Sequence, residues 1–587
     1  MNPAATARGA VEEPPAPHDR LSRSPDPTAA PDPVAEARAK RRRLVGFALV
    51  LGALLRLAQY AVNRSLWLDE GLLVSNFLDR SWAGLLEPLH RGQTAPLGFL
   101  VLEKLAVAAL GRSELALRLV PLLGGLATLA LLPRVARRYV SRPALPLAVA
   151  IVALAPFLIY YSSEVKQYAL DALASVVVLG LAMALARRPR DRRAALALAA
   201  FGLLAVWISQ PVVFMLGGTG LVLGARALRR GDRRTVAALA AMAAAWVASF
   251  AGSYLVSRHQ VTDPVFMRSF WADGFMPLPP HTLRELTWLP RMAAHVFREP
   301  LGTMGLGRTL SAQAVNAAAA VACAVCFVAG CAWMRRHRPL RLALLLAPMG
   351  LALLASAVRA YPFGSGTFTS GGRVLIYLLP ALAFVIAEGA MAIRRALPRR
   401  LAAPAFAGVA ALVLLPSVSY AALSVPHLRS EVKPLLDFAA EHRRPGDVMY
   451  VAYSGQAVFE YYAPRYGWSR RDTVWGVCSR FHPERYLADL DRLRGRARVW
   501  VFFTQGAAVP LRDRPGELFD EQGMMTSYLD MIGHRLDDRV SLEASLYLYD
   551  FSDPALASRR VGVNVPPLQP RALNDCRGTW QPMNLLH

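Results

Sequence analysis

The stretch Ser65-Leu66-Trp67-Leu68-Asp69-Glu70 follows almost directly on the first long apolar run, Leu44 to Val62. Two adjacent carboxylates therefore stand where the chain would leave a bilayer. A charged side chain at that depth is costly unless it faces water, a partner or a substrate. Trp67 is typical of the rings that anchor a loop at the membrane interface. The pattern favours a carboxylate with a chemical role at the membrane surface, and an ordinary charged loop is the alternative.

The composition of the chain is that of a membrane protein. Its 587 residues are 54% hydrophobic, the mean hydropathy is +0.30, and apolar runs of about the length of a membrane span recur along it. The formal net charge of +26 is a feature that many nucleic-acid-binding proteins share. The arginines, however, cluster in short turns between apolar runs, which is the pattern of cytoplasmic membrane loops. Nucleic-acid binding is therefore not predicted.

The apolar runs predict roughly eleven spans in a multi-pass protein of the plasma (inner) membrane. The expected spans cover about 44–62, 116–136, 143–161, 168–186, 194–209, 211–228, 235–256, 311–334, 340–358, 373–393 and 402–421. With this assignment every arginine-rich turn falls on one face. The shorter run 96–110 carries Glu103 and Lys104, so we expect it to lie along the membrane face. Residues 1–43 form a predicted disordered tail, which Lys40-Arg41-Arg42-Arg43 holds in the cytoplasm.

Charged and polar residues become more frequent from about Pro426, which separates a predicted membrane domain, 44–425, from a soluble domain, 426–587. An amphipathic helix is predicted over 431–442. Strands are predicted over 448–453, 498–503 and 545–551. The predicted fold class is therefore mainly α: a polytopic membrane helical bundle followed by an α/β domain on the extracytoplasmic face.

The five cysteines fall into two groups. Cys323, Cys326 and Cys331 share an apolar run and are predicted to be small residues of a membrane helix. Cys478 and Cys576 lie in the soluble part, where an extracytoplasmic location would allow a disulfide between them.

Polar residues that can carry chemistry fall on the predicted outer face. They are Asp69, Glu70, Lys104, Arg118, Glu164, Lys166, Tyr168, Asp171 and Arg373. Carboxylates there can remove a proton from a hydroxyl, and nearby cations can stabilise a phosphate leaving group. The alternative is structural, with Arg118 and Arg373 as interface anchors and Asp171 as a charge that favours a helix start. His281 and His295 have no metal-ligand spacing and are predicted to be surface residues.

Four segments together resemble the GT-C glycosyltransferases. They are Trp67-Leu68-Asp69-Glu70, Ala95-Pro96-Leu97, Glu114-Leu115-Ala116-Leu117-Arg118-Leu119-Val120-Pro121 and Tyr160-Tyr161-Ser162-Ser163-Glu164-Val165-Lys166-Gln167-Tyr168-Ala169-Leu170. The chain is most similar to the dolichyl-phosphate-mannose–protein mannosyltransferase-like group, to which the lipid A aminoarabinose transferases are also similar. The resemblance covers about residues 44 to 400 and is strongest from 63 to 185.

The resemblance implies a polyprenyl-phosphate-linked sugar as donor and transfer to a hydroxyl of a cell-envelope glycan, lipid or protein on the outer face. It implies Asp69 as general base, with Glu70 as its neighbour, and Glu164 or Asp171 as a second acidic group. Arg118, Lys166 and Arg373 become phosphate-binding candidates, and Tyr168 and Lys104 complete the predicted binding set. No cofactor is implied with certainty, and a divalent metal stays open, with Asp69 and Asp171 as its ligands.

The chain also departs from the group. Thr94-Ala95-Pro96-Leu97 stands where the group often has a His-Pro-Pro-Leu-like segment, so a histidine contribution is lost. The domain 426–587 does not match the soluble insertion of the protein mannosyltransferases. The alternative function is a polytopic transporter or lipid flippase, which the scarcity of mid-span charges disfavours. A second alternative is a membrane-anchored binding or assembly protein whose active part is 426–587.

Overall fold

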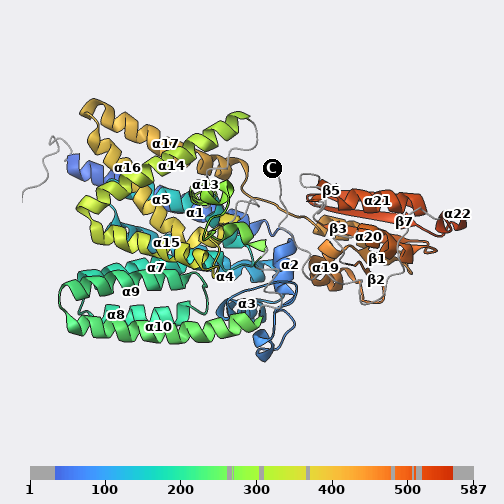
Figure 1. Ribbon diagram of the computed structural model, residues 1–587. Coiled ribbons are helices and arrows are strands. Elements are labelled where there is room, and N and C mark those ends of the chain that lie inside the picture. The colour runs from blue at the N-terminus through green and yellow to red at the C-terminus, as the bar shows by residue number, and fades with distance from the viewer. Residues whose placement is uncertain are drawn as a thin grey trace, which may run out of the picture.

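The computed structural model describes residues 33–260, 268, 270–299, 301–302, 310–364, 371–477, 483–504, 508–510 and 518–559. It consists of a helical bundle and, at one end of that bundle, a smaller part built on a sheet (Figure 1). The predicted fold class, a mainly α membrane bundle with a C-terminal α/β region, is confirmed.

Nine helices in the described residues are long and apolar enough to cross a membrane, as expected of a multi-pass membrane protein. They are α1 (Pro33–Ala61), α4 (Glu114–Tyr139), α7 (Tyr168–Arg187), α9 (Val212–Arg229), α10 (Arg233–Gln260), α14 (Leu310–His337), α15 (Pro339–Ala357), α16 (Leu379–Ala396) with the preceding η4 (Gly371–Leu378), and α17 (Arg399–Leu423). A tenth span would be the pair of α5 (Leu145–Leu154) and α6 (Pro156–Tyr160), which η2 (Tyr161–Ser163) extends and which is bent by 54°.

Two details differ from the sequence-based expectation. The predicted span 194–209 is the helix α8 (Arg192–Ala205), whose 14 residues are too few to cross a bilayer unaided. It nevertheless belongs to the bundle, because Trp246 Nε1 on α10 donates a hydrogen bond to the Ala199 carbonyl at 3.1 Å. The first helix begins at Pro33, so Lys40-Arg41-Arg42-Arg43 lie on α1 and not in a preceding tail. Residues 1–32 lie outside the described part.

The arginine-rich turns gather at the end of the bundle far from the sheet, which we call the arginine-rich end (Figure 1). The carboxylate of Glu388 is buried there and forms ion pairs with Arg338 at 3.1 Å and Arg395 at 3.5 Å. Arg338 Nη1 also donates to the Tyr139 carbonyl at 3.3 Å. These contacts tie α16 to the end of α4 and to the turn after α14.

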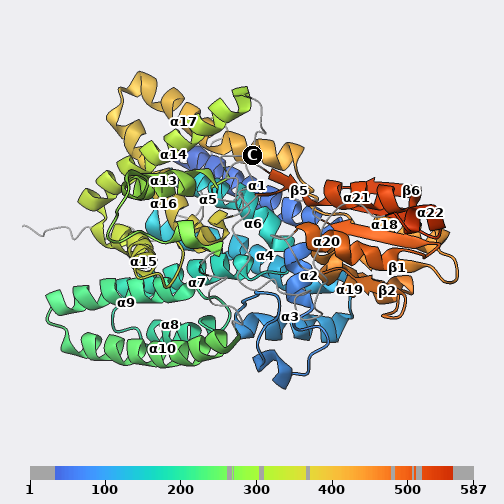
Figure 2. The same ribbon diagram turned by 45° about the vertical axis from the view of Figure 1, so that its right-hand side comes forward.

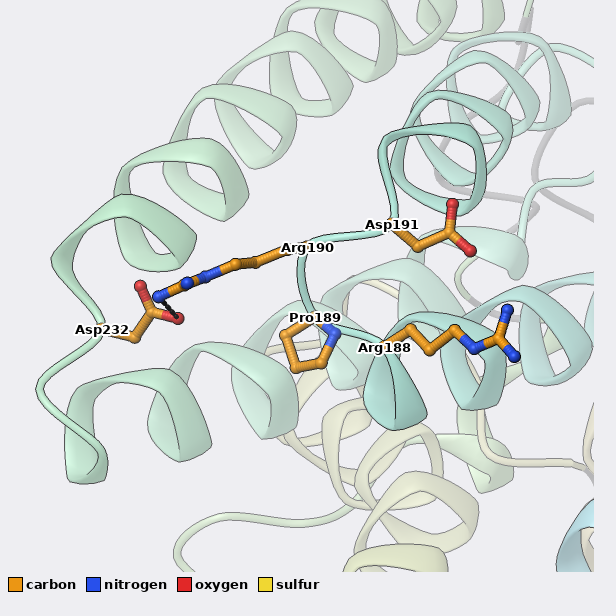
Figure 3. Close-up of a pocket in the computed structure, with 5 residues that line it drawn as sticks. All are labelled: Arg188, Pro189, Arg190, Asp191 and Asp232. Atoms are coloured by element: carbon orange, nitrogen blue, oxygen red, sulfur yellow. Dashed lines mark ion pairs between the residues drawn. The ribbon is translucent and has the colours of Figure 1, made fainter.

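A second group of turns at the same end is joined by one ion pair. Arg190, between α7 and α8, lies 3.8 Å from the Asp232 carboxylate, between α9 and α10. Figure 3 shows the surface pocket that these residues line together with Arg188, Pro189 and Asp191. The predicted gathering of basic turns at one end of the bundle is thus seen in the described structure.

The C-terminal sheet has the strand order β2-β1-β3-β7-β6. Its strands are β1 (Val448–Val451), β2 (Thr473–Trp475), β3 (Val499–Thr504), β6 (His534–Ser541) and β7 (Ala544–Asp550), and β4 (Ala508–Pro510) pairs separately with β5 (Leu518–Asp520). β1 is parallel to β2 and β3, whereas β7 is antiparallel to β3 and β6. The three strands predicted from the sequence correspond to β1, β3 and β7.

Helices and short turns cover this sheet (Figure 2). They are α18 (Lys433–His442), η5 (Tyr453–Gly455), α19 (Gln456–Tyr462), η6 (Ala463–Tyr466), α20 (Pro483–Leu490), η7 (Asp491–Leu493), α21 (Glu521–Ile532) and α22 (Pro554–Ala557). Side chains of β3 alternate between the two faces. Trp500 and Phe502 join one apolar core, while Val499 and Val501 join the other. The central strand is therefore buried on both faces, which explains its continuous apolar sequence.

Two segments connect the spans at the sheet end of the bundle. The first, after α1, contains α2 (Leu68–Val74), η1 (Ala83–Leu86) and α3 (Leu97–Leu110); the second, after α10, contains η3 (Ala272–Gly274), α12 (Leu283–Leu286) and α13 (Trp288–Arg298). The run predicted to lie along the membrane face is α3, which has 14 residues and lies beside α2 (Figure 1). A Cβ at Gly71 would come within 3.0 Å of Val458 Cγ2, so glycine allows α2 to pack closely on α19.

The sheet region and the first connecting segment share one apolar core. Leu66 and Phe77 from that segment pack in the same cluster as Leu436 and Phe459. The hydroxyl of Tyr462 accepts a hydrogen bond from the Leu66 N–H at 3.0 Å and donates one to Glu114 Oε1 at 2.8 Å. The C-terminal region is therefore part of the structure that positions residues 66–70.

We expect Tyr462→Phe to reduce the free energy of unfolding by about 1–3 kcal/mol, because it leaves the buried Leu66 N–H and a Glu114 oxygen without this partner. Denaturant unfolding of the purified protein, followed by tryptophan fluorescence, measures the effect. Tyr466→Phe is the matched control, since its hydroxyl bonds Asp437 Oδ1 at 2.9 Å in an exposed position. Equal losses in the two variants would contradict the role assigned to Tyr462.

Candidate active site

Glu70 is the buried centre of the site. Its carboxylate accepts hydrogen bonds from Arg118 Nε at 2.9 Å and Nη2 at 2.7 Å, and from Arg64 Nη1 at 2.9 Å. The backbone N–H groups of Val165 and Trp67 donate to it at 3.1 and 3.3 Å. The carboxylate therefore joins the start of α2 to α4 and to the turn before α7.

This environment keeps Glu70 ionised. Burial alone would raise the pKa of its carboxyl, but the guanidinium groups of Arg118 and Arg64 outweigh burial and lower the pKa to about 2. Arg118 has little left to offer a ligand, because Nη1 and Nη2 also donate to the carbonyls of Arg64 and Ser65, at 2.7 and 3.0 Å. The structure thus places Glu70 and Arg118 behind the site, where they hold α2 in place.

Asp69, the next residue on α2, turns toward solvent. Its side chain keeps 23% of its surface exposed, and Arg373 Nη1 lies 3.3 Å from Oδ2. Burial opposes ionisation of this carboxyl, but the charges of Lys166, Arg373 and Arg429 together lower its pKa below the ordinary value. Asp69 is therefore an ionised and accessible carboxylate with three cationic groups around it.

The turn before α7 brings two ionisable side chains to the site, those of Lys166 and Glu164. Lys166 is buried and its Nζ donates a hydrogen bond to Gln93 Oε1 at 2.8 Å. Burial is the main reason that the pKa of Lys166 is lowered. Glu164 is fully buried, and within the described residues neither of its carboxylate oxygens has a hydrogen-bond partner. Burial, and then the charge of Glu70, raise the pKa of Glu164.

Arg373 enters the site from η4, at the start of the last but one span. Its guanidinium lies 5.6 Å from the centre of the Trp271 ring. The preceding Gly372 N–H donates to Glu299 Oε2 at 2.7 Å, and His295 Nε2 lies 3.4 Å from the same oxygen. Burial raises the pKa of Glu299 to about 8. The prediction that His295 is a surface residue is wrong, since its side chain is buried on α13.

The other predicted residues lie around or outside this group. Tyr168 is buried, with its ring 4.8 Å from that of Tyr161. Asp171 is buried one turn further along α7, and its Oδ1 has no hydrogen-bond partner in the described part of the chain. Lys104 is held elsewhere, because its Nζ donates to the Phe77 carbonyl at 3.2 Å and also to the Arg80 carbonyl.

Two predictions remain, a divalent metal bound by Asp69 and Asp171 and a disulfide between Cys478 and Cys576. Among the described residues there is no group of three or more His, Cys, Asp or Glu side chains suited to a metal, so Asp69 and Asp171 belong to none. Cys478 and Cys576 lie outside the described residues. Cys323, Cys326 and Cys331 are free thiols on the span α14, as expected.

Three contributors to the site were not predicted. Arg64 immediately precedes the quoted stretch, and an arginine between the end of an apolar run and the Asp69-Glu70 pair was a signal that could have been used. Gln93 and Arg429 gave no such signal, because neither belongs to a motif. Arg429 lies near the predicted border between the two domains, far from Asp69 in sequence but close to it in space.

Comparison with known proteins gives structural relatives only. No protein-family model and no curated protein matches the chain. The structure is similar to the oligosaccharyltransferase AglB from Archaeoglobus fulgidus in complex with an inhibitory peptide and a dolichol-phosphate, at 12% identity and a TM-score of 0.46, over 86% of this chain and 74% of that one. It is also similar to ArnT from Cupriavidus metallidurans bound to undecaprenyl phosphate, at 13% identity and a TM-score of 0.47, over 89% and 100%.

Both of these proteins are GT-C superfamily glycosyltransferases, and ArnT is a lipid A aminoarabinose transferase.

We expect Glu70→Gln to lower the free energy of unfolding by about 3–5 kcal/mol, since it leaves Arg64 and Arg118 buried without a counter-charge. Glu460→Gln, which removes an exposed partner of Arg91, should change it by less than about 1 kcal/mol. Thermal unfolding in detergent compares the two. Equal transition temperatures for the two variants would contradict the central role of Glu70.

The stabilisation that Glu70 provides should also depend on pH. The folded-state pKa of about 2 lies below the ordinary value of 4.5, so this stabilisation is fully present above pH 4.5 and is lost as the pH falls toward 2. The difference in stability between the wild type and Glu70→Gln should therefore shrink over that interval. A difference that stays constant down to pH 2 would mean that the Glu70 carboxylate is not the group responsible.

Proposed function

We propose that the protein is an integral membrane glycosyltransferase of GT-C type, which moves a sugar from a polyprenyl-phosphate donor to a hydroxyl acceptor. One observation carries the proposal: the ionised, partly exposed carboxylate of Asp69 lies among Lys166, Arg373 and Arg429 at the sheet end of an apolar bundle. A base beside a cluster of cations is what a hydroxyl nucleophile and a phosphate leaving group require. The motifs around Asp69, Arg118 and Glu164 add support by their resemblance to GT-C enzymes.

The reaction proposed is a direct displacement at the anomeric carbon of the donor. Asp69 accepts the proton of the acceptor hydroxyl, and the oxygen of that hydroxyl attacks the anomeric carbon. The bond from this carbon to the phosphate oxygen breaks, and its electron pair stays on the phosphate. The products are a glycoside of inverted configuration, a protonated Asp69 and a polyprenyl monophosphate, so atoms and charges balance.

The cations around Asp69 have two roles in this proposal. Arg373 and Lys166 bind the phosphate through charge-assisted hydrogen bonds, which strengthen as negative charge develops on the leaving group. In the absence of donor the same cations lower the pKa of Asp69. A bound phosphate neutralises part of their charge, so the pKa of Asp69 rises toward its ordinary value and the carboxylate becomes a stronger base. Donor binding would thus activate the base.

The remaining predicted residues take supporting positions in the proposal. Glu70 and Arg118 are positioning residues, because they fix α2 and with it Asp69. Glu164 holds the acceptor through its two unpaired oxygens. Tyr168 lies beside the phosphate-binding cations, while Asp171 and Lys104 have no step assigned to them. No metal enters the proposed step.

The proposed orientation follows from the distribution of charge. The arginine-rich end would face the cytoplasm, together with the N-terminal basic residues of α1. The site and the region from 426 onward would then lie on the extracytoplasmic face of the plasma membrane. The acceptor proposed is a hydroxyl of a cell-envelope glycan, lipid or protein, and the sugar is a hexose or a pentose.

The decisive test is sugar transfer by the full-length protein in lipid nanodiscs, with labelled polyprenyl-phosphate sugars as donors. We expect Asp69→Asn to reduce the release of polyprenyl monophosphate by at least about 100-fold, since the amide cannot take the proton. Asp79→Asn is the control, because Asp79 belongs to the same connecting segment and pairs with Arg112 in an exposed position. Its rate should equal that of the wild type.

Undiminished turnover in a folded Asp69→Asn would remove Asp69 from its role as base. Movement of lipid between leaflets, with no turnover of any donor, would instead support the flippase reading and contradict the proposed function. The orientation is tested separately by labelling single cysteines at exposed positions of each end of the bundle from one side of sealed vesicles.

A further inference from the structure

A short segment carries the chain from α17 into α18, and it is clamped to the residues that precede Asp69. On one side, the His427 N–H donates to Gln59 Oε1 at 2.6 Å, and Gln59 Nε2 donates to the His427 carbonyl at 2.8 Å. On the other side, the Glu431 carboxylate accepts from the Ser65 N–H at 3.2 Å and from its hydroxyl at 3.0 Å. We call residues 427–433 the junction segment.

The contact between Ser65 and Glu431 is reinforced by backbone groups of the junction segment. The N–H groups of Val432 and Lys433 both donate to Ser65 Oγ, at 3.1 and 3.2 Å. Lys433 Nζ donates in addition to the Asn63 carbonyl. The segment is therefore fixed against the end of α1 on both sides of Arg429.

Arg429 is held over an aromatic ring beside the site. Its guanidinium carbon lies 3.4 Å from the centre of the Trp67 ring, a cation–π contact with a side chain that is only 3% exposed. Trp67 stands two residues before Asp69. The positive charge of Arg429 acts to lower the pKa of both Asp69 and Glu164, so the guanidinium lies near these two carboxylates.

The polar groups around Arg429 are not satisfied by the protein. Within the described residues Arg429 donates no hydrogen bond, although a guanidinium carries five N–H donors. The Trp67 indole N–H and both oxygens of Glu164 are buried and also lack partners there. Buried polar groups without partners are rare in folded proteins and call for an explanation. A guanidinium that makes its aromatic contact through its central carbon keeps its N–H groups available for an anion.

A purely structural role for Arg429 explains less. As a counter-charge for Glu164 it would be expected to share a hydrogen bond with that carboxylate, as Arg118 does with Glu70, and it shares none. Burial already raises the pKa of Glu164, so the need for a counter-charge is reduced. The clamps on both sides of Arg429 instead preorganise the guanidinium, which lowers the entropy lost when a ligand binds.

We infer that Arg429 is a third phosphate-binding residue, which the junction segment brings beside Arg373 and Lys166 to bind the phosphate of the lipid-linked donor. The inference rests on the proposed function and extends it in one respect. The site is completed by the start of the C-terminal region, so this region is a part of the donor site and more than an attached domain.

The test measures binding and does not depend on turnover. The full-length protein in nanodiscs is titrated with a polyprenyl monophosphate, and with a polyprenol of the same length as the uncharged reference. We expect Arg429→Gln to weaken binding of the monophosphate by about tenfold to a hundredfold and to leave polyprenol binding unchanged, because charged hydrogen bonds are lost. Arg429→Lys, which keeps the charge but loses the planar fork, should recover part of the affinity.

Arg443→Gln is the matched control. Arg443 also belongs to the C-terminal region and also stacks on a tryptophan, with its guanidinium carbon 3.9 Å from the ring centre of Trp468, but it bonds Asp472 away from the site. Its substitution should leave monophosphate affinity at the wild-type value. Transition temperatures of all variants verify that the comparison is made between folded proteins.

Each outcome has a distinct meaning. A wild type that binds monophosphate and polyprenol equally would contradict the proposed function, and this inference with it. A wild type that prefers the monophosphate, together with an equal preference in Arg429→Gln, would contradict the inference alone. Inorganic phosphate is titrated as the soluble ligand for comparison. If it binds at least tenfold more weakly than the lipid phosphate, the lipid headgroup is the ligand. Equal binding of the two would overturn the assignment to the donor.

Discussion

A buried carboxylate between two arginines, Glu70 with Arg64 and Arg118, is the interaction on which the rest of the site depends. Removing such a charge from water is expensive, and the cost is offset only where the geometry of the partners is favourable. Here two guanidinium groups and two backbone N–H groups converge on one carboxylate. Because adjacent residues of a helix point about 100° apart, fixing Glu70 inward turns Asp69 outward. The two adjacent carboxylates therefore differ in their surroundings, since Glu70 is buried between arginines and Asp69 is partly exposed.

The same network explains how distant segments meet at Asp69. The turn before α7 is anchored by the Val165 N–H, so Glu164 and Lys166 on either side of it are placed near α2. The sheet region is anchored by Tyr462 and by the apolar core that it shares with the first connecting segment. The site is therefore assembled from the ends of spans and from the C-terminal region together, and cations from three separate segments surround one carboxylate.

Charge is distributed unevenly along the bundle. At the arginine-rich end, arginines are paired or exposed in short turns, and Glu388 ties α16 to the turns after α4 and α14. At the other end, several charged groups are buried and incompletely paired, among them Glu164. Incompletely paired charges in a low-dielectric setting interact strongly with whatever enters, which is the physical basis of electrostatic preorganisation. The two ends of the described bundle thus differ in how their charged groups are paired.

Local sequence patterns were enough to predict most of the spans and several strands. Apolar runs bounded by arginines predicted the spans, because the length of a span and the sign of its flanking charges are local properties. Short runs of β-branched and aromatic residues predicted strands such as 498–503, and Asp69 was singled out because it follows a span closely. The number of spans was predicted less exactly. The apolar run 194–209 was counted as a span, but its helix, α8, has only 14 residues, and composition alone does not show where a helix ends.

Only the tertiary structure decided which charged groups surround Asp69 and which are held by other parts of the protein. Arg118 and Arg373 carry the same charge and both lie near a span end, yet the first is occupied by Glu70 and the second faces Asp69. Lys104 is bound to backbone carbonyls away from the site, while Arg429, which no motif marks, lies beside it. These outcomes depend on contacts between residues that lie from 24 to 304 positions apart, and a hydrogen bond across such a separation leaves no periodic trace in the sequence.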